Sequence, residues 1–200
     1  MLDRPARRLI DPVLNRLGRA LADRGWTANA VTLLGLALGL LAALTIAMGA
    51  PWLALIPLLA SRMADGLDGA VARATARTDF GGYLDIACDF AFYGAIPLAF
   101  VFHDDANGLA AAFLLASFYV NGTSFLGYAI LAEKRGITTQ AQGIKSLYYS
   151  NGLLEGTETI VFFILLCLFP TAFAALSWVF GTLCFLTAIL RIHGASKLFT

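Results

Sequence analysis

Residues 28–48 read ANAVTLLGLALGLLAALTIAM, a continuous apolar run without one charged side chain. A helix needs about 20 such residues to cross the hydrocarbon core of a bilayer. Runs of similar length recur along the rest of the chain, at 52–74, 80–102, 108–132, 150–169 and 171–192. We therefore predict an all-α, polytopic membrane protein with six transmembrane helices.

The composition of the 200-residue chain supports this class. Hydrophobic residues make up 59% and charged residues 14%, against about half and about a quarter in soluble domains. Six spans would use roughly 120 residues, which leaves no room for a soluble catalytic domain. The formal net charge of +1 argues against a nucleic-acid-binding protein, because phosphate contacts need a clustered excess of Lys and Arg. The function must therefore be carried out in the membrane or at its surface.

The N-terminal segment differs from the rest of the chain. Residues 1–24 contain six Arg and three Asp. Between them lie apolar residues at helical three-and-four spacing: Leu9, Ile10, Val13, Leu14, Leu17 and Leu21. This pattern predicts a basic amphipathic helix that lies on a membrane face. The chain thus divides into an amphipathic arm, 1–24, and a six-helix transmembrane catalytic domain, 25–200.

The connections between the predicted spans alternate in charge. Three of them, 49–51, 103–108 and 170–171, contain no Lys or Arg. The arm, the 73–79 turn, the 133–148 loop and the C-terminal end hold nearly all of the basic residues. Basic connections stay in the cytoplasm, so we expect a multi-pass protein with both termini on the cytoplasmic side.

Several carboxylates lie where the membrane makes them costly. Six of the thirteen acidic residues fall within predicted spans: Asp65, Asp68, Asp85, Asp89, Glu155 and Glu158. Such residues are usually functional, since a charge at membrane depth must be paired or hydrated. The first four form two pairs spaced by three and four residues, so that each pair shares one helical face. Because the two helices are consecutive and joined by a short turn, we expect the four carboxylates to converge near the cytoplasmic surface.

Four converging carboxylates repel one another, and divalent cations would resolve the repulsion. All-oxygen ligation suits Mg²⁺, Mn²⁺ or Ca²⁺. The alternative is a set of Asp–Arg pairs, such as Arg62 with Asp65, which would account for one or two of the acids. Gly69 lets a phosphate approach the helix, and the Arg73 guanidinium would hold its oxygens. The pattern therefore indicates chemistry on a phosphate group of an amphiphile.

The same stretch resembles a known family signature. Residues 65–73 (DGLDGAVAR) and 81–89 (GGYLDIACD) match the pattern D-x-x-D-G-x-x-A-R and G-x-x-x-D-x-x-x-D of the CDP-alcohol phosphotransferases, or CDP-alcohol phosphatidyltransferases. Residues 28–32 (ANAVT) are similar to the family's P-N-x-x-T, with Ala in place of Pro. The whole chain, including 156–159 (GTET), looks most like a functionally unassigned bacterial inner-membrane branch of that family.

The resemblance implies a role for each matching residue. Asp65, Asp68 and Asp85 match ligands of a first Mg²⁺ or Mn²⁺ ion. Asp85 also matches a ligand of a second ion, and Asp89 matches the residue that shares this ion and takes the proton of the acceptor hydroxyl. Six further positions match contacts to the nucleotide-linked donor: Asn29, Thr32, Gly69, Arg73, Thr78 and Gly81.

The expected activity follows from that resemblance. We expect a phospholipid-synthesis enzyme of the bacterial inner membrane that moves a phosphatidyl group from CDP-diacylglycerol to the hydroxyl of a small alcohol and releases CMP. One alternative is transfer of a phosphoalcohol from a soluble CDP-alcohol to diacylglycerol. A divalent-cation transporter is a third hypothesis, disfavoured because the outer parts of the second and third spans, 52–59 and 92–102, are almost wholly apolar. Partners would be the bilayer, the CDP-linked lipid, the small alcohol and a second copy in a homodimer, with no nucleic acid.

The sequence leaves the acceptor alcohol open. Lys145 and Arg191 near the cytoplasmic surface would suit a phosphorylated acceptor. Glu155 and Glu158, three residues apart, would suit a polyol or an amine. These four residues are the candidate acceptor contacts.

Overall fold

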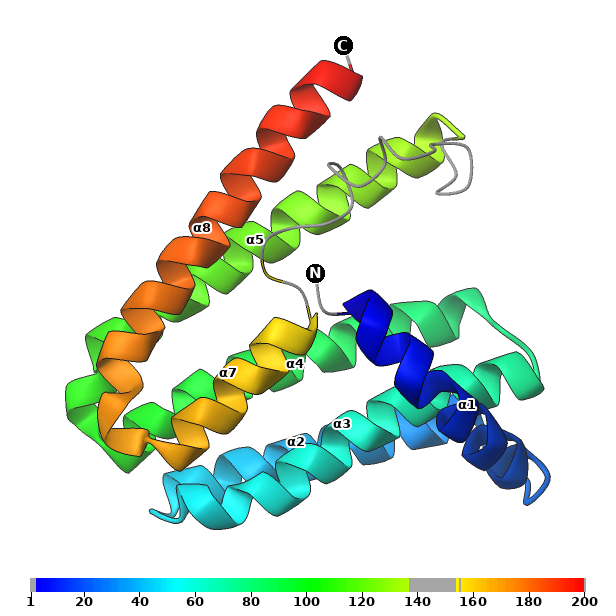
Figure 1. Ribbon diagram of the computed structural model, residues 1–200, viewed down its shortest axis with the longest axis horizontal. Coiled ribbons are helices and arrows are strands. Elements are labelled where there is room, and N and C mark those ends of the chain that lie inside the picture. Colours follow the sequence, from blue (N-terminus) through cyan, green and yellow to red (C-terminus); the bar gives the residue numbers. More distant parts are fainter. Residues whose placement is uncertain (1–2, 137–153, 155, 200) are drawn as a thin grey trace.

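A computed structural model describes residues 3–136, 154 and 156–199 of the chain (Figure 1). All regular elements in these ranges are helical, which confirms the all-α class there. The long helices are α1 (Asp3–Ala22), α2 (Ala28–Ala47), α3 (Pro51–Ala74), α4 (Asp79–His103), α5 (Gly108–Lys134), α7 (Gly156–Leu168) and α8 (Phe173–Leu198). Two short 3-10 turns, η1 (Asp105–Asn107) and η3 (Pro170–Ala172), precede α5 and α8.

Four helical segments of the described chain are long and apolar enough to cross a membrane: Ala28–Ala47, Asp79–His103, Asp105–Lys134 and Pro170–Leu198. Helix α3 is 24 residues long, but Arg62, Asp65 and Asp68 interrupt its apolar character. Helix α7 has 13 residues, and the start of the span predicted at 150–169 lies outside the described residues. The structure therefore supports several spans, and the count of six stays a prediction.

Two threonine side chains cap the starts of the helices that contribute residues to the candidate active site described below. The Thr27 hydroxyl oxygen accepts from the Ala30 backbone N–H (3.2 Å) and caps α2. Similarly, the Thr78 hydroxyl oxygen accepts from the Gly81 backbone N–H (3.0 Å) and caps α4. Such caps satisfy backbone donors that the first turn of a helix leaves unpaired. Each cap therefore fixes the residue at which its helix begins.

Helix α3 packs against both α2 and α1. Helices α2 and α3 run side by side (Figure 1), and the buried Ser61 hydroxyl of α3 donates to the Gly35 carbonyl of α2 (2.6 Å). Helix α1 crosses α3 at Gly18, where an added Cβ would lie 2.6 Å from the Ala70 Cβ. Any larger residue at this position would collide with Ala70, so only glycine permits this approach. The backbone of α1 therefore packs directly against α3.

The second half of the molecule is held by aromatic packing. Phe162 of α7 stacks on Phe180 of α8, with ring centroids 4.0 Å apart. Phe163 packs edge-on against Phe92 of α4 (5.6 Å) and Phe118 of α5 (6.2 Å). These rings join α4, α5, α7 and α8 into one apolar core.

Candidate active site

The structure brings three of the four signature carboxylates together. One oxygen each from Asp65, Asp68 and Asp85 lies within 4.8 Å of the other two. Asp68 is buried, with 6% of its surface exposed, and the other two are half-buried. The first two belong to α3 and the third to α4, so the convergence expected from two consecutive antiparallel helices is present. Three carboxylate oxygens at this separation fit a hard divalent cation.

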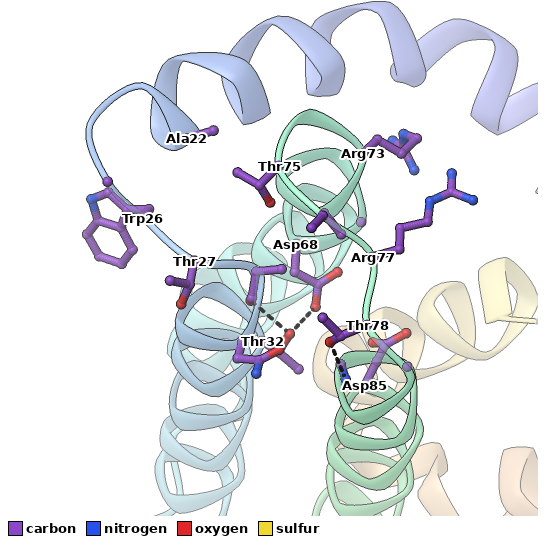
Figure 2. A pocket seen from close by; sticks show the side chains of 18 residues that line it. Ala22, Trp26, Thr27, Thr32, Asp68, Arg73, Thr75, Arg77, Thr78 and Asp85 are labelled. Atoms are coloured by element: carbon purple, nitrogen blue, oxygen red, sulfur yellow. Dashed lines mark hydrogen bonds between the residues drawn. The ribbon is translucent and has the colours of Figure 1, made fainter.

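Asp68 is held in place by the neighbouring helix. The Thr32 hydroxyl of α2 donates to Asp68 Oδ2 at 2.6 Å (Figure 2). The family resemblance placed Thr32 among the donor contacts. The structure adds that Thr32 orients a carboxylate of the acidic cluster.

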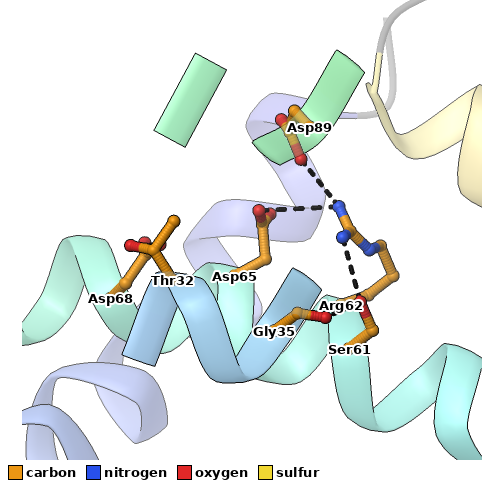
Figure 3. A network of polar contacts seen from close by, with 7 residues as sticks. All are labelled: Thr32, Gly35, Ser61, Arg62, Asp65, Asp68 and Asp89. Atoms are coloured by element: carbon orange, nitrogen blue, oxygen red, sulfur yellow. Dashed lines mark hydrogen bonds and ion pairs between the residues drawn. The ribbon is translucent and has the colours of Figure 1, made fainter. Parts of the chain in front are cut away.

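Asp89 is not one of these three residues, and it faces an arginine at the edge of the cluster. Arg62 Nη1 lies 2.9 Å from Asp89 Oδ1 and 3.5 Å from Asp65 Oδ1. In Figure 3, dashed lines join one guanidinium nitrogen to both carboxylates, while Asp68 and Thr32 lie on the far side of Asp65. Sequence spacing suggested only the Arg62–Asp65 pair. The closer partner in the structure is Asp89, which no local spacing could indicate because it is 27 residues away.

Arg62 itself is firmly fixed. Its side chain is 8% exposed, its Nη2 donates to the Ser61 hydroxyl at 3.0 Å, and its guanidinium carbon lies 3.9 Å from the centroid of the Phe92 ring. A guanidinium over an aromatic face gains a cation–π contact in addition to its ion pairs. Arg62 therefore positions the carboxylates of the site, a role that its place in the sequence does not reveal.

Replacement of Arg62 tests this assignment. We expect Arg62→Met to lower the free energy of unfolding by about 3 kcal/mol, because the change leaves two neighbouring carboxylates without their counter-charge. Mn²⁺ should recover part of the loss, since a bound cation restores the missing positive charge. Thermal unfolding in detergent micelles, with and without Mn²⁺, measures both effects. An unfolding midpoint unchanged in the absence of metal would contradict the assignment.

A cavity of about 600 Å³ opens beside the acidic cluster. Its lining contains all six residues predicted to contact the donor: Asn29, Thr32, Gly69, Arg73, Thr78 and Gly81. Asp68 and Asp85 also line it, as does Arg77, which lies beside Arg73 (Figure 2) and was not among the predicted donor contacts. A volume of this size is ordinary for a small-molecule or cofactor site.

The N-terminal helix contributes to this cavity through Arg73. Asn15 Oδ1 of α1 accepts from Arg73 Nε (3.2 Å) and from Arg73 Nη2 (2.9 Å). The sequence did not predict this contact of Asn15, because amphipathic helices carry many polar residues and nothing in the pattern marks one of them as a partner of Arg73. The contact fixes the guanidinium in the lining of the cavity.

A second cavity, of about 570 Å³, has Asp89 in its lining. Its lining comes from four helices, α4, α5, α7 and α8, and from Leu154, which precedes α7. The residues are Ile86, Asp89, Phe90, Tyr93, Gly94, Leu115, Phe118, Tyr119, Asn121, Gly122, Phe125, Leu154, Gly156, Thr159 and Arg191. Among the predicted acceptor residues, Arg191 belongs to this lining. Glu158 lies in the first turn of α7 and not in the lining. Lys145 and Glu155 lie outside the described residues.

Taken together, these features define a class of protein. Apolar helices carry an acidic cluster suited to divalent cations, with an arginine-bearing cavity at the cluster and a second cavity at Asp89. This is the arrangement of a metal-dependent membrane enzyme acting on a phosphate ester.

Comparison with known proteins identifies the family. The family model described as CDP-alcohol phosphatidyltransferase matches residues 26–190, and the chain belongs to this family. The resemblance seen in the signature residues is thereby confirmed. So is the expected activity at the level of the family, which consists of enzymes that transfer phosphatidyl groups.

Individual relatives agree with this. The inner membrane protein YnjF of Escherichia coli is 45% identical over 193 residues, covering 96% of this chain and 94% of YnjF. The archaetidylinositol phosphate synthase of Pyrococcus horikoshii is 42% identical over 77 residues, or 38% of this chain and 41% of that protein. Crystal structures of the Mycobacterium tuberculosis phosphatidylinositol phosphate synthase PgsA1, one with CDP-DAG bound and one with manganese and citrate, share the fold. Each has a TM-score of 0.72 at 23% identity; they cover 91% and 90% of this chain and 92% and 87% of their own chains, respectively.

Proposed function

We propose that this protein transfers a phosphatidyl group from CDP-diacylglycerol to the hydroxyl of a small alcohol, with release of CMP. The observation that carries the proposal is the first cavity, in which all six predicted donor residues lie together with Asp68 and Asp85. Those residues come from α2, α3, α4 and the turn before α4, so the fold alone gathers them.

The acidic cluster is proposed to hold two Mg²⁺ or Mn²⁺ ions. Asp65, Asp68 and Asp85 would ligate the first, and Asp85 with Asp89 the second. Their oxygen donors fit these cations, and one related structure contains manganese. When bound, the ions would neutralise negative charge on the phosphates during transfer.

Donor binding and proton transfer are assigned to two side chains, Arg73 and Asp89. Arg73 would bind the non-bridging oxygens of the donor diphosphate through its planar fork. Asp89 would accept the proton of the acceptor hydroxyl, because it lines the second cavity and lies on the edge of the acidic cluster. The acceptor oxygen would attack the phosphorus that carries the diacylglycerol, and the bond from that phosphorus to CMP would break.

The same site would suit the alternative transfer from a soluble CDP-alcohol to diacylglycerol, because the nucleotide part of the donor is the same. Incubation of the purified protein with either donor, Mg²⁺ or Mn²⁺ and a panel of acceptors distinguishes the two. CMP release only with CDP-diacylglycerol supports the proposal, and release only with CDP-alcohols favours the alternative. No release from any donor, with metal-dependent ion flux in liposomes, would favour the transporter hypothesis instead.

The membrane arrangement belongs to the same proposal. We infer six spans, formed by α2, α3, α4, α5, the segment that ends with α7, and α8, with α1 lying on the membrane surface as an amphipathic helix. Both termini and the acidic cluster would face the cytoplasm of a bacterial cell, where soluble nucleotide is available, and the protein would sit in the inner membrane as a homodimer. The basic turn between α3 and α4 and the basic residues of α1 support this orientation.

Arg73→Lys separates donor binding from metal binding. Lysine keeps the charge but loses the planar fork that holds two phosphate oxygens, and it cannot reproduce both bonds to Asn15. We expect the KM for the donor to rise about tenfold, a loss of roughly 1.4 kcal/mol, while the Mg²⁺ concentration for half-maximal activity changes little. CMP release measured over a range of donor concentrations and of Mg²⁺ concentrations provides both values. An unchanged donor KM would contradict the role given to Arg73.

A further inference from the structure

The second cavity has a distinctive balance of charge. Among the described residues that line it, Asp89 and Arg191 are the only ones with a carboxylate or a basic side chain. Asp89 is also paired with Arg62, whose Nη1 lies 2.9 Å from Asp89 Oδ1, so its charge is already compensated. The lining otherwise consists of five aromatic rings, small or aliphatic residues, and the polar groups of Asn121 and Thr159. A ligand in this cavity therefore meets a single basic side chain, that of Arg191, among the described residues that line it.

The one basic side chain of this described lining already has protein partners. Arg191 is 8% exposed, and its Nη1 lies within hydrogen-bonding distance of the Asn121 carbonyl oxygen (3.0 Å), Asn121 Oδ1 (2.8 Å) and Ser124 Oγ (2.6 Å). These contacts tie α8 to α5. A phosphate that bound Arg191 at this nitrogen would have to displace oxygens that already accept from it.

A phosphorylated alcohol would be poorly matched to such a cavity. A phosphate monoester carries about −1.5 to −2 charges at pH 7, and a site that binds it specifically has to supply matching positive groups. The single positive charge of Arg191 is smaller than the charge of the phosphate. Hydroxyl groups are better matched, because Tyr119 and Asn121 provide polar atoms for them, and the aromatic rings cover the carbon faces of the ligand.

We propose that the acceptor is a polyol or similar alcohol that carries no phosphate, and that it binds in the second cavity with its reacting hydroxyl at Asp89. This inference rests on the proposed phosphatidyl transfer and narrows its substrate class. In the reaction, the hydroxyl oxygen forms a bond to the phosphorus that bears the diacylglycerol. The bond from that phosphorus to CMP breaks, and the hydroxyl proton passes to Asp89.

Matched pairs of acceptors test the inference. The purified full-length protein, in micelles containing CDP-diacylglycerol and Mg²⁺ or Mn²⁺, would be given myo-inositol or myo-inositol 1-phosphate, and glycerol or glycerol 3-phosphate. We expect CMP release with the unphosphorylated member of at least one pair, with kcat/KM at least about tenfold above that of its phosphorylated partner, a difference of roughly 1.4 kcal/mol. Preference for a phosphorylated member, or no release with either unphosphorylated alcohol, would overturn the inference.

A charge added to the cavity supplies a second test. Thr159→Arg would place another basic residue in the lining, and Thr159→Gln would add length without charge. We expect only the arginine variant to shift the ratio of kcat/KM values toward the phosphorylated member of each pair. An equal shift in both variants, or none in the arginine variant, would contradict the charge argument.

Failure of this inference can be told apart from failure of the proposed function. Calorimetric binding of CDP with Mn²⁺ reports on the donor site alone, and CMP release with any acceptor reports on transfer. CMP release confined to phosphorylated acceptors would overturn only the substrate class. Absence of both CDP binding and CMP release would count against phosphatidyl transfer itself, and the inference would fall with it.

Discussion

Asp68→Asn is expected to abolish phosphatidyl transfer, with a fall of about a thousandfold or more in turnover. Asp68 is the most buried member of the acidic cluster, at 6% exposed, and its carboxylate accepts from Thr32. Asparagine would fill the same space but would not supply the negative charge that a divalent cation requires. Loss of one ligand charge removes several kcal/mol of charge stabilisation, and each 1.36 kcal/mol corresponds to about a factor of ten in rate. Asp65→Asn and Asp85→Asn are expected to behave alike.

Two measurements check this expectation. CMP release would be followed over a Mg²⁺ titration, and Mn²⁺ binding would be followed by electron paramagnetic resonance. Asp79→Asn is the matched control, because Asp79 is an exposed residue in the first turn of α4 and lies outside the cluster. The control should keep wild-type turnover and Mn²⁺ binding. Normal activity of Asp68→Asn at the same low Mg²⁺ concentration would refute the metal assignment.

The positions of the helices were predictable from the sequence, because each apolar run of about 20 residues indicates a membrane-spanning helix. The run 80–102 corresponds to Asp79–His103, and the run 52–74 corresponds to Pro51–Ala74. The end of α8 was less predictable. All but the first two residues of the apolar run 171–192 lie in α8, which continues to Leu198, because backbone hydrogen bonding does not stop where the side chains become polar. Hydropathy marks the part of a helix that lies in hydrocarbon, not the whole helix.

The acidic cluster was also predictable, for a different reason. Spacings of three and four residues on two consecutive helices are local information, and they were enough to predict that the four carboxylates converge. The structure gathers Asp65, Asp68 and Asp85 within 4.8 Å of one another. The second cavity has no such signal. Its contacts join residues far apart in the chain, such as Arg191 and Asn121, which are separated by 70 positions. Only the packing of α5 against α8 reveals them.

The interaction of Asp89 with Arg62 is a third kind of feature, which neither spacing nor hydropathy predicts. Spacing pairs Arg62 with the nearest acid in its own helix. In the fold, the Arg62 guanidinium instead points toward α4, where it lies over the Phe92 ring. Asp89 is thereby held at the border between the acidic cluster and the second cavity. This position is the structural basis for giving it a role that differs from the other three carboxylates.

Asp89→Asn is expected to keep donor binding while turnover collapses by a factor of about 10² to 10⁴, the range that a positioned general base contributes. The substituted amide still offers an oxygen to Arg62 Nη1, which lies 2.9 Å from Asp89 Oδ1, so the local packing is preserved. The first metal's proposed ligands and the donor contacts are all unchanged. The substitution removes an interaction that is made only in the transition state. Binding of the donor in the ground state should therefore largely survive.

The measurement pairs calorimetric binding of the CDP-linked donor, with Mg²⁺ present, with CMP release for Asp89→Asn and Asp68→Asn side by side. Both variants delete one negative charge from the same part of the site, so a purely electrostatic role would make them alike. A base at Asp89 instead predicts strong donor binding without turnover in Asp89→Asn, and loss of both in Asp68→Asn. Equal loss of binding in the two variants would leave Asp89 as an ordinary ligand, and retained turnover in Asp89→Asn would exclude it as the base.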